Sequence, residues 1–224
     1  MSYKNEFKNC LDGLFESLCD VSDWMYENPE LGFQEFKTSK YLVDYIEKNS
    51  ESVNYPSHGL ETAFDITFGE KGPLTVICVE YDALPEIGHA CGHNIIATAS
   101  IGAGLGLKDI ASKLGIRVKL LGTPAEEGGG GKIILINEGA FEDASCSMMI
   151  HPGYEDVVNP TFTTIEQYFV EYFGKDAHAA GAPDQGINAL DAQIQLFVNA
   201  STYRQQMVQS NRMHGVITDG GFKP

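Results

Sequence analysis

The apolar run Leu74-Thr-Val-Ile-Cys-Val-Glu80 leads directly into Tyr81-Asp-Ala-Leu-Pro-Glu-Ile-Gly-His-Ala-Cys-Gly-His-Asn94, and small and apolar residues then continue to Leu107. The run is typical of a buried strand, and the small-residue stretch is typical of a helix. In an open α/β sheet, functional side chains gather where a strand passes into a helix. This junction is rich in side chains that can bind a metal: Glu80, Asp82, His89, Cys91 and His93. The segment therefore predicts an α/β fold with a metal site at the edge of the sheet.

The alternation of strand and helix continues after this junction. Strands are expected over 74–80, 116–121 and 146–150, and helices over 95–112 and 131–138. This β-α-β-α-β order predicts a mostly parallel sheet with helices on both faces. Gly115 and Gly139 follow two of the helices, where a left-handed cap is expected. Upstream, the pattern indicates helices over 3–27 and 35–48 and a strand over 63–68.

The pattern changes near residue 160. A strand over 164–173, a long helix over 186–209 and a second strand over 214–218 are expected after it. These elements indicate the beginning of a small α+β unit. We therefore expect one domain over 1–160 and part of another over 161–224.

Composition excludes several classes of partner. The chain has 15 Lys and Arg against 31 Asp and Glu, a net charge of −16, which argues against binding to nucleic acid. The N-terminus lacks the apolar region of a signal peptide, and no apolar run is long enough for a bilayer, so no membrane partner is expected. Five irregularly spaced cysteines do not suggest a disulfide framework. A reducing, cytoplasmic location is expected.

Cys91 and His93 flank Gly92, which permits a tight bend at the entry to the expected helix. The helix N-terminus and a nearby divalent ion would both favour a thiolate. A thiolate with a neutral imidazole suits zinc best, and the sulfur disfavours cobalt and manganese. Taken alone, the pair also fits a buried cysteine beside a histidine that caps the helix. The sequence shows no second doublet of the kind a closed structural zinc site uses.

Glu126 and Glu127 follow the strand expected over 116–121 and precede four glycines. Because adjacent side chains of an extended turn point in different directions, one carboxylate can bind a metal while the other faces water. That division provides a ligand and a general base, the pair that metal-assisted hydrolysis needs. Taken alone, the two residues also fit a solvated acidic turn.

His151 follows the strand expected over 146–150, so it lies at the same edge of the sheet as the other two clusters. This placement makes it a candidate ligand, although a lone histidine there also fits a hydrogen-bonded structural residue. Asp82 and His89 are expected to orient the imidazoles of the ligands. Glu80 is interpreted as a charge at a strand end.

In this combination and order, the motifs resemble those of the aminoacylase/carboxypeptidase group of co-catalytic metallopeptidases. The resemblance is strongest to the branch with hippurate, auxin-conjugate and p-aminobenzoyl-glutamate hydrolases and aminoacylase-like dipeptidases, and it covers essentially the whole chain. The matching motifs are Asn28-Pro-Glu-Leu-Gly32, Tyr81-Asp-Ala-Leu-Pro85, His89-Ala-Cys-Gly-His-Asn94, Thr123-Pro-Ala-Glu-Glu-Gly128, His151-Pro152 and Gly174-Lys-Asp-Ala-His-Ala-Ala180.

The resemblance implies two divalent metal ions, with zinc as the best fit and manganese or cobalt as alternatives. Their ligands would be Cys91, His93, Glu127 and His151. Glu126 would be the general base. His178 would be a lid histidine that reaches the site of the partner subunit and stabilises the oxyanion. Taken alone, His178 fits a loop histidine that caps nearby backbone.

The implied fold is a zinc exopeptidase-like catalytic domain, of which 1–160 is the N-terminal part, followed by an incomplete ferredoxin-like lid over 161–224 that forms a homodimer. The implied reaction is the hydrolysis, by a metal-activated water, of the amide bond in N-acyl amino acids or dipeptides. Arg212 is a candidate clamp for the substrate carboxylate because arginine binds carboxylate with two hydrogen bonds. His214 opens the same expected strand and is assigned to the substrate site.

The chain departs from the family pattern in two respects. Asn94 stands where many members have Asp, and the family continues past the position of Pro224 with a segment that supplies a further histidine ligand. The second departure supports an alternative hypothesis, a truncated and catalytically incomplete homologue that only binds metal or dimerises. A third hypothesis, a structural zinc module, predicts that chelation unfolds the chain.

Overall fold

A computed structural model of the chain describes residues 2–158 and 160–222. The chain forms two compact units, Met1–Val157 and Val158–Pro224. Within the described ranges, no helix combines the length and apolar character that crossing a bilayer requires.

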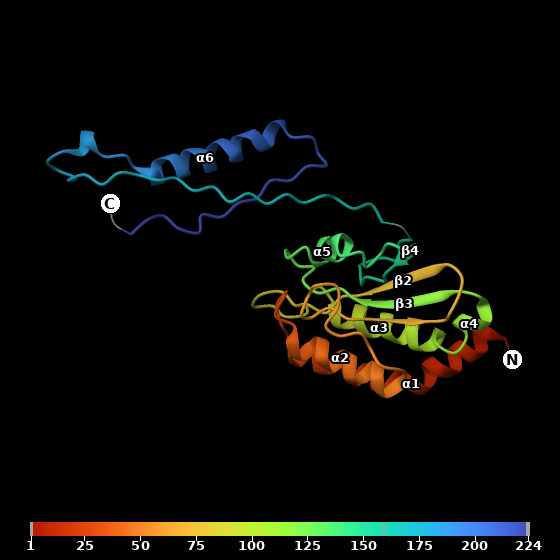
Figure 1. Cartoon of the computed structure of the whole chain (residues 1–224). Coiled ribbons are helices and arrows are strands. Elements are labelled where there is room, and N and C mark those ends of the chain that lie inside the picture. The colour runs from red at the N-terminus through yellow and green to blue at the C-terminus, as the bar shows by residue number, and fades with distance from the viewer. Residues whose placement is uncertain (1, 159, 223–224) are drawn as a thin grey trace. The chain divides into compact units, whose positions relative to one another are not determined.

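The first unit contains a four-stranded sheet with the order β1-β3-β2-β4 (Figure 1). The strands are β1 (Asp65–Phe68), β2 (Leu74–Val79), β3 (Arg117–Gly122) and β4 (Ala144–Met148). Strand β2 pairs in parallel with both β3 and β4, and β1 runs antiparallel to β3 at one edge. Strand β2 is an apolar run that is buried along nearly its whole length, which is typical of a strand covered on both faces of the sheet.

The helices of this unit are α1 (Tyr3–Glu27), α2 (Phe36–Asn49), α3 (His93–Leu107), α4 (Ala111–Leu114) and α5 (Gly131–Asn137). The single helix expected over 95–112 is therefore wrong in its extent, since it is two helices with a turn between them. Gly115 ends α4 at φ 67°, and Gly139 follows α5 at φ 76°. Both glycines adopt the left-handed conformation expected for caps.

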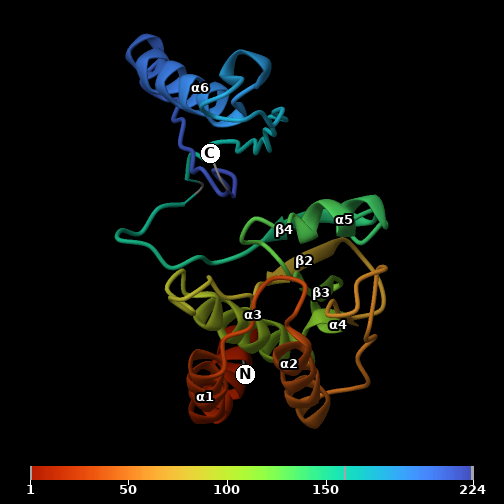
Figure 2. The ribbon, with the colours of Figure 1, turned by 90° about the vertical axis from the view of Figure 1, so that its left-hand side faces the viewer.

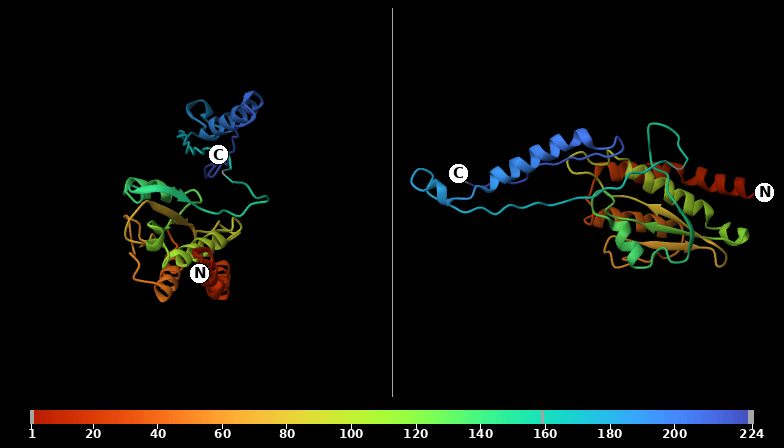
Figure 3. Two further views of the ribbon diagram at one scale, coloured as in Figure 1. Left: turned by 90° about the vertical axis from the view of Figure 1, so that its right-hand side faces the viewer. Right: turned by 90° about the horizontal axis from the view of Figure 1, so that it is seen from above.

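Alternate side chains of β2 face two separate cores. Ile77 and Val79 pack with α1, α2 and α3 on one face, whereas Val76 and Cys78 pack with Leu135 of α5 on the other. Figures 1 and 2 show α3 between the sheet and the two N-terminal helices, and Figure 3 shows the same layers from two further directions. The helix that begins with His93 is thus fixed between the sheet and α1.

Glycines on α3 permit this close packing. A Cβ at Gly104 would lie 2.5 Å from the Leu120 side chain on β3, and one at Gly106 would lie 2.7 Å from the ring of Phe7 on α1. A helix that is apolar and small on all sides is suited to a fully buried position. The composition of this stretch therefore explains how α3 fits between two layers.

The second unit contains α6 (Ala189–Tyr203) between two short 3₁₀ helices, η1 (Pro183–Gln185) and η2 (Arg204–Gln206). The helix is shorter than the range 186–209 expected from the sequence, because the Asn188 side chain caps its start by accepting from the N–H of Leu190.

The strands expected over 164–173 and 214–218 are wrong for this structure. Between residues 160 and 222, the described chain has no strand and a single isolated bridge, from Lys175 to Ile187. A strand requires a neighbouring strand for its N–H and C=O groups. The sequence of these two segments therefore predicted strands that do not form, because no hydrogen-bonded neighbour lies along them.

Candidate metal centre

Cys91 and His93 lie at the start of α3, where the chain bends sharply through Gly92. Gly92 has φ 85°, and a Cβ there would lie 2.9 Å from the ring of Pro152. A side chain at this position would meet both a strained backbone and a clash. The glycine therefore lets the segment that carries His151 approach the start of α3.

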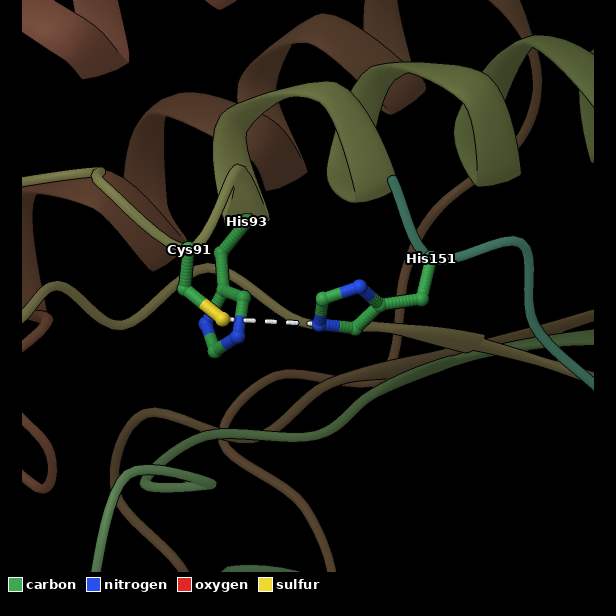
Figure 4. A group of neighbouring side chains, drawn as sticks. All are labelled: Cys91, His93 and His151. Carbon is green, nitrogen blue, oxygen red and sulfur yellow. Dashed lines mark hydrogen bonds between the residues drawn. The ribbon is translucent and has the colours of Figure 1, made fainter. Parts of the chain in front are cut away.

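Cys91, His93 and His151 form the first group of candidate ligands (Figure 4). Their donor atoms lie within 4.8 Å of one another, and Cys91 Sγ is 3.4 Å from Nε2 of His151. His151 Nδ1–H donates to the carbonyl of Pro152 at 2.7 Å, which turns Nε2 toward the cysteine. The sulfur and one nitrogen of each histidine thus face a common point.

His93 also belongs to a second group, with Glu126 and Glu127. Its Nε2 lies 3.8 Å from Oε2 of Glu126 and 3.9 Å from Oε1 of Glu127. The imidazole is fully buried, whereas the side chains of Glu126 and Glu127 are 43% and 24% exposed. The structure therefore brings together, from three strand ends, the five side chains that the sequence selected as ligands and general base.

Asp82 fixes the orientation of this cluster. Its Oδ1 accepts from Nδ1–H of His93 at 3.0 Å, and its Oδ2 accepts from the backbone N–H of Glu127 at 2.8 Å. Burial alone would raise the pKa of Asp82, but the hydrogen bonds from His93 and Glu127 outweigh it and lower that pKa. Asp82 thus fixes the orientation of the His93 imidazole, and the role expected of it toward a metal ligand stays a prediction.

Glu80 directly follows β2, as the charge at a strand end that the sequence indicated, and it is buried. It is 1% exposed and forms an ion pair with Lys132 of α5 through Oε1. Its other oxygen lies 3.5 Å from Nε2 of His93. Glu80 and Lys132 therefore lie beside the candidate ligands. The position of Glu80 at the end of an apolar strand was the sequence signal that could have indicated its burial.

The donor atoms fit a bound cation. Nε2 of His93 and Oε2 of Glu80 are buried, and the described structure gives neither a hydrogen-bond partner. Burial raises the pKa of the Cys91 thiol to about 12, and Glu127, Glu126 and Glu80 add to the shift. A protein cannot keep a thiolate there without positive charge, and a divalent ion deprotonates a coordinating thiol. Cys91 and His93 therefore fit a divalent metal ion that is coordinated by a thiolate and an imidazole.

The carboxylates repel one another as well. Burial raises the pKa of Glu126, the charges of Glu80 and Glu127 raise it further, and Lys132 opposes them. Burial alone would lower the pKa of His93, but Asp82 and Glu80 outweigh it and raise that pKa. Several anionic groups converge on one buried imidazole, which is the electrostatic setting that a metal ion relieves.

The glycines after Glu127 close the loop on itself. A Cβ at Gly131 would lie 1.9 Å from the carbonyl oxygen of Pro124, and one at Gly129 would lie 2.6 Å from the Cβ of Ala125. No side chain fits at either distance. The glycine run therefore allows the loop to fold tightly behind the carboxylates.

The remaining predicted residues are placed differently. His89 is 5% exposed and its pKa is lowered by burial and by the charge of His93, yet the described structure shows no hydrogen bond between these two rings. The role expected of His89, to orient the imidazoles of the ligands, stays a prediction.

His178, Arg212 and His214 lie in the second unit. His178 Nδ1 accepts from the N–H groups of Ala180 and Gly181, at 3.2 and 2.9 Å, so it caps its own loop. Arg212 donates to backbone carbonyls of its own segment, and with His214 it lines a hollow beside η2. Their roles toward a substrate stay predictions.

Comparison with curated proteins gives relatives over most of the chain. It is 39% identical to the Xaa-Arg dipeptidase of Mus musculus over 228 residues, which cover 96% of this chain and 53% of the relative. It is 30% identical to a p-aminobenzoyl-glutamate hydrolase polypeptide of Escherichia coli (strain K12) over 226 residues, which cover 92% and 47%. The chain spans about half the length of the curated relatives it matches. No family model matches it.

Solved structures share the fold. The Bacillus subtilis YXEP protein, a dinuclear metal binding peptidase from the M20 family, matches with a TM-score of 0.54 and 25% identity over 61% of this chain and 42% of that one. A putative aminohydrolase from methicillin resistant Staphylococcus aureus matches with a TM-score of 0.65 and 19% identity over 92% and 58%.

The sheet and the clustered donor atoms give an α/β protein with a candidate metal centre. The chain is similar to peptidases and amidohydrolases of the aminoacylase/carboxypeptidase group, and one of its structural relatives is described as an M20 family peptidase.

Proposed function

We propose that this chain belongs to a metal-dependent amidohydrolase that cleaves N-acyl amino acids or dipeptides. The observation that carries the proposal is the convergence of Cys91, His93, Glu127 and His151 with the carboxylate of Glu126. Two relatives support the substrate class, since one is named as a dipeptidase and the other as a hydrolase of an acylated glutamate. Cleavage next to a free carboxylate is the chemistry these names share.

Two divalent cations are proposed as the cofactor, because one structural neighbour is described as a dinuclear metal binding peptidase. Cys91, His93, Glu127 and His151 would hold them. A thiolate and two imidazoles among the donors favour zinc over manganese or cobalt. When bound, the ions would polarise the scissile carbonyl and lower the pKa of water.

Glu126 is assigned as the general base. It is a carboxylate with an elevated pKa and a partly exposed side chain, so it is open to water and holds a proton more readily than an ordinary glutamate. It would take a proton from the attacking water and pass it to the leaving amine. Asp82 keeps Nε2 of His93 directed at the cluster while this transfer occurs.

Residues of the second unit are proposed to complete the substrate site. Arg212 would bind the substrate carboxylate, with His214 beside it, and His178 would stabilise the oxyanion. A ferredoxin-like lid is the proposed architecture of this unit. The assignment of His178 rests on the resemblance of Gly174-Lys-Asp-Ala-His-Ala-Ala180 to the family motif, and that of Arg212 rests on the two hydrogen bonds that arginine can donate to a carboxylate.

The test is an assay of the purified chain after chelation and after reloading with zinc, cobalt or manganese. N-acyl amino acids, Xaa-Arg dipeptides and p-aminobenzoyl-glutamate are the substrates to compare. We expect turnover only in the loaded protein, because the donors lack a cation otherwise. Metal uptake without turnover on any substrate would favour the catalytically incomplete homologue, and no metal uptake would contradict the proposal.

A homodimer formed through the second unit is also proposed. Large apolar side chains of this unit are exposed, among them Phe162, Ile165 and Phe169 at 82%, 80% and 95%. Apolar surface of this kind marks interaction sites. Light scattering should give twice the mass of one chain, and a monomer at all concentrations would refute the dimer.

A reducing, cytoplasmic location is proposed as well. The five cysteines, all unpaired, support it.

A further inference from the structure

A buried acid outside the ligand cluster holds the loop that carries Glu126 and Glu127. Glu35, which directly precedes α2, is 0% exposed. Its Oε1 accepts from the backbone N–H of Ala125 at 2.7 Å, and its Oε2 accepts from the hydroxyl of Thr62 at 3.0 Å. Both partners are neutral groups, so the carboxylate serves as a pair of fixed acceptors.

The backbone of Ala125 has an unusual conformation that its surroundings must stabilise. It is fully buried and has φ 55°, the left-handed region that non-glycine residues rarely adopt. A backbone in this conformation persists only where its surroundings fix it. Glu126 and Glu127 follow immediately, so the backbone of Ala125 sets the direction in which both carboxylates leave the loop.

The position of Glu35 is itself fixed from behind. The hydroxyl of Tyr81 donates to the carbonyl of Thr62 at 2.6 Å, and Tyr81 is fully buried between Glu80 and Asp82 in sequence. A continuous set of hydrogen bonds therefore joins the β2 end to the Ala125 loop. Asp82 contacts the same loop separately, by accepting from the backbone N–H of Glu127.

We propose that Glu35 is a positioning residue: its hydrogen bond to Ala125 aims the Glu126 and Glu127 carboxylates at the metal centre. The proposal rests on the proposed function of the cluster as a metal site. What matters is an acceptor oxygen at the right distance, since the partner is a neutral N–H. Burial raises the pKa of Glu35 while the hydrogen bonds oppose the shift, in keeping with a role that does not depend on charge.

Four variants test this role. Glu35→Gln keeps an acceptor oxygen at the same reach without charge, Glu35→Asp keeps the charge but shortens the reach, and Glu35→Leu removes the acceptor. Glu30→Leu is the matched control, because Glu30 lies in the same linker between α1 and α2 and its carboxylate also accepts from backbone N–H groups, those of Lys37 and Thr38 in the first turn of α2. Zinc affinity is measured by titration calorimetry, the cobalt-loaded proteins are compared by visible absorption, and unfolding is followed by circular dichroism.

We expect Glu35→Leu to weaken zinc binding by roughly 10- to 100-fold, as for loss of a group that orients ligands. Glu35→Gln should bind zinc like the unsubstituted chain, and Glu35→Asp should fall between them, with an altered cobalt spectrum. Glu30→Leu should lower the unfolding temperature but leave zinc affinity unchanged. If Glu35→Leu does not fold, the comparison of the other two variants still tests the proposal, because Glu35→Gln should bind zinc more tightly than Glu35→Asp.

The proposal is overturned if Glu35→Asp binds zinc as well as the unsubstituted chain while Glu35→Gln does not, because charge would then be the requirement. It is also overturned if Glu30→Leu and Glu35→Leu lose zinc affinity equally, because that indicates general loosening. Failure of the unsubstituted chain to bind zinc would instead refute the metal site itself.

Discussion

Replacing Glu126 by glutamine is expected to lower kcat by about 100- to 10,000-fold, the contribution of a general base. The amide has the size of the carboxylate but cannot accept a proton. Glu126 is the more exposed of the two loop carboxylates, and its Oε2 lies 3.8 Å from Nε2 of His93. The chemical step should therefore fail while the ligand set stays in place. Steady-state kinetics with the best substrate of the loaded protein, together with zinc content, measures both quantities.

The matched variant is Glu127→Gln, one residue further on. Glu127 is assigned as a ligand, so this change should reduce zinc content as well as turnover. If Glu126→Gln keeps full turnover, or if it loses zinc as Glu127→Gln does, the division of the pair into base and ligand is wrong. The two outcomes separate a residue that moves a proton from one that holds the metal.

The fold of the first unit was largely predictable because its signals are local. The strands β2, β3 and β4 appeared where apolar runs predicted them, and Gly115 and Gly139 took the left-handed caps. In the second unit the same kind of signal failed. A strand was expected over residues 164–173, but a strand is defined by its hydrogen-bonded neighbour, and the sequence of one segment does not reveal that neighbour.

The candidate site shows the same limit. The proximity of the candidate ligands was predictable, because parallel strands place their carboxyl ends at one edge of the sheet. The supporting acids were missed, since Glu80 pairs with Lys132 across 52 residues and Glu35 binds Ala125 across 90. Only the folded chain shows that these carboxylates are buried. His89 is buried as well, and the role expected of it toward the ligand imidazoles stays a prediction.

Replacing His93 by alanine is expected to abolish zinc uptake. His93 is the residue shared by both groups of donors, and its Nε2 faces Glu80, Glu126 and Glu127 at 3.5, 3.8 and 3.9 Å. No other described residue belongs to both groups. Its loss also leaves Asp82 buried without the partner that lowers its pKa. Metal content after dialysis against zinc, measured by mass spectrometry, should fall to background.

Asp82→Asn tests the same imidazole from behind. The asparagine amide can accept from only one of the two N–H groups that Asp82 binds, so either His93 or Glu127 loses its orientation. Zinc affinity should fall by roughly 10- to 100-fold, less than for His93→Ala. His58→Ala is the control, because that histidine pairs with Asp65 at 3.1 Å and belongs to neither donor group. Zinc bound at full stoichiometry by His93→Ala would refute the site, since the two groups of donors would then have no common ligand.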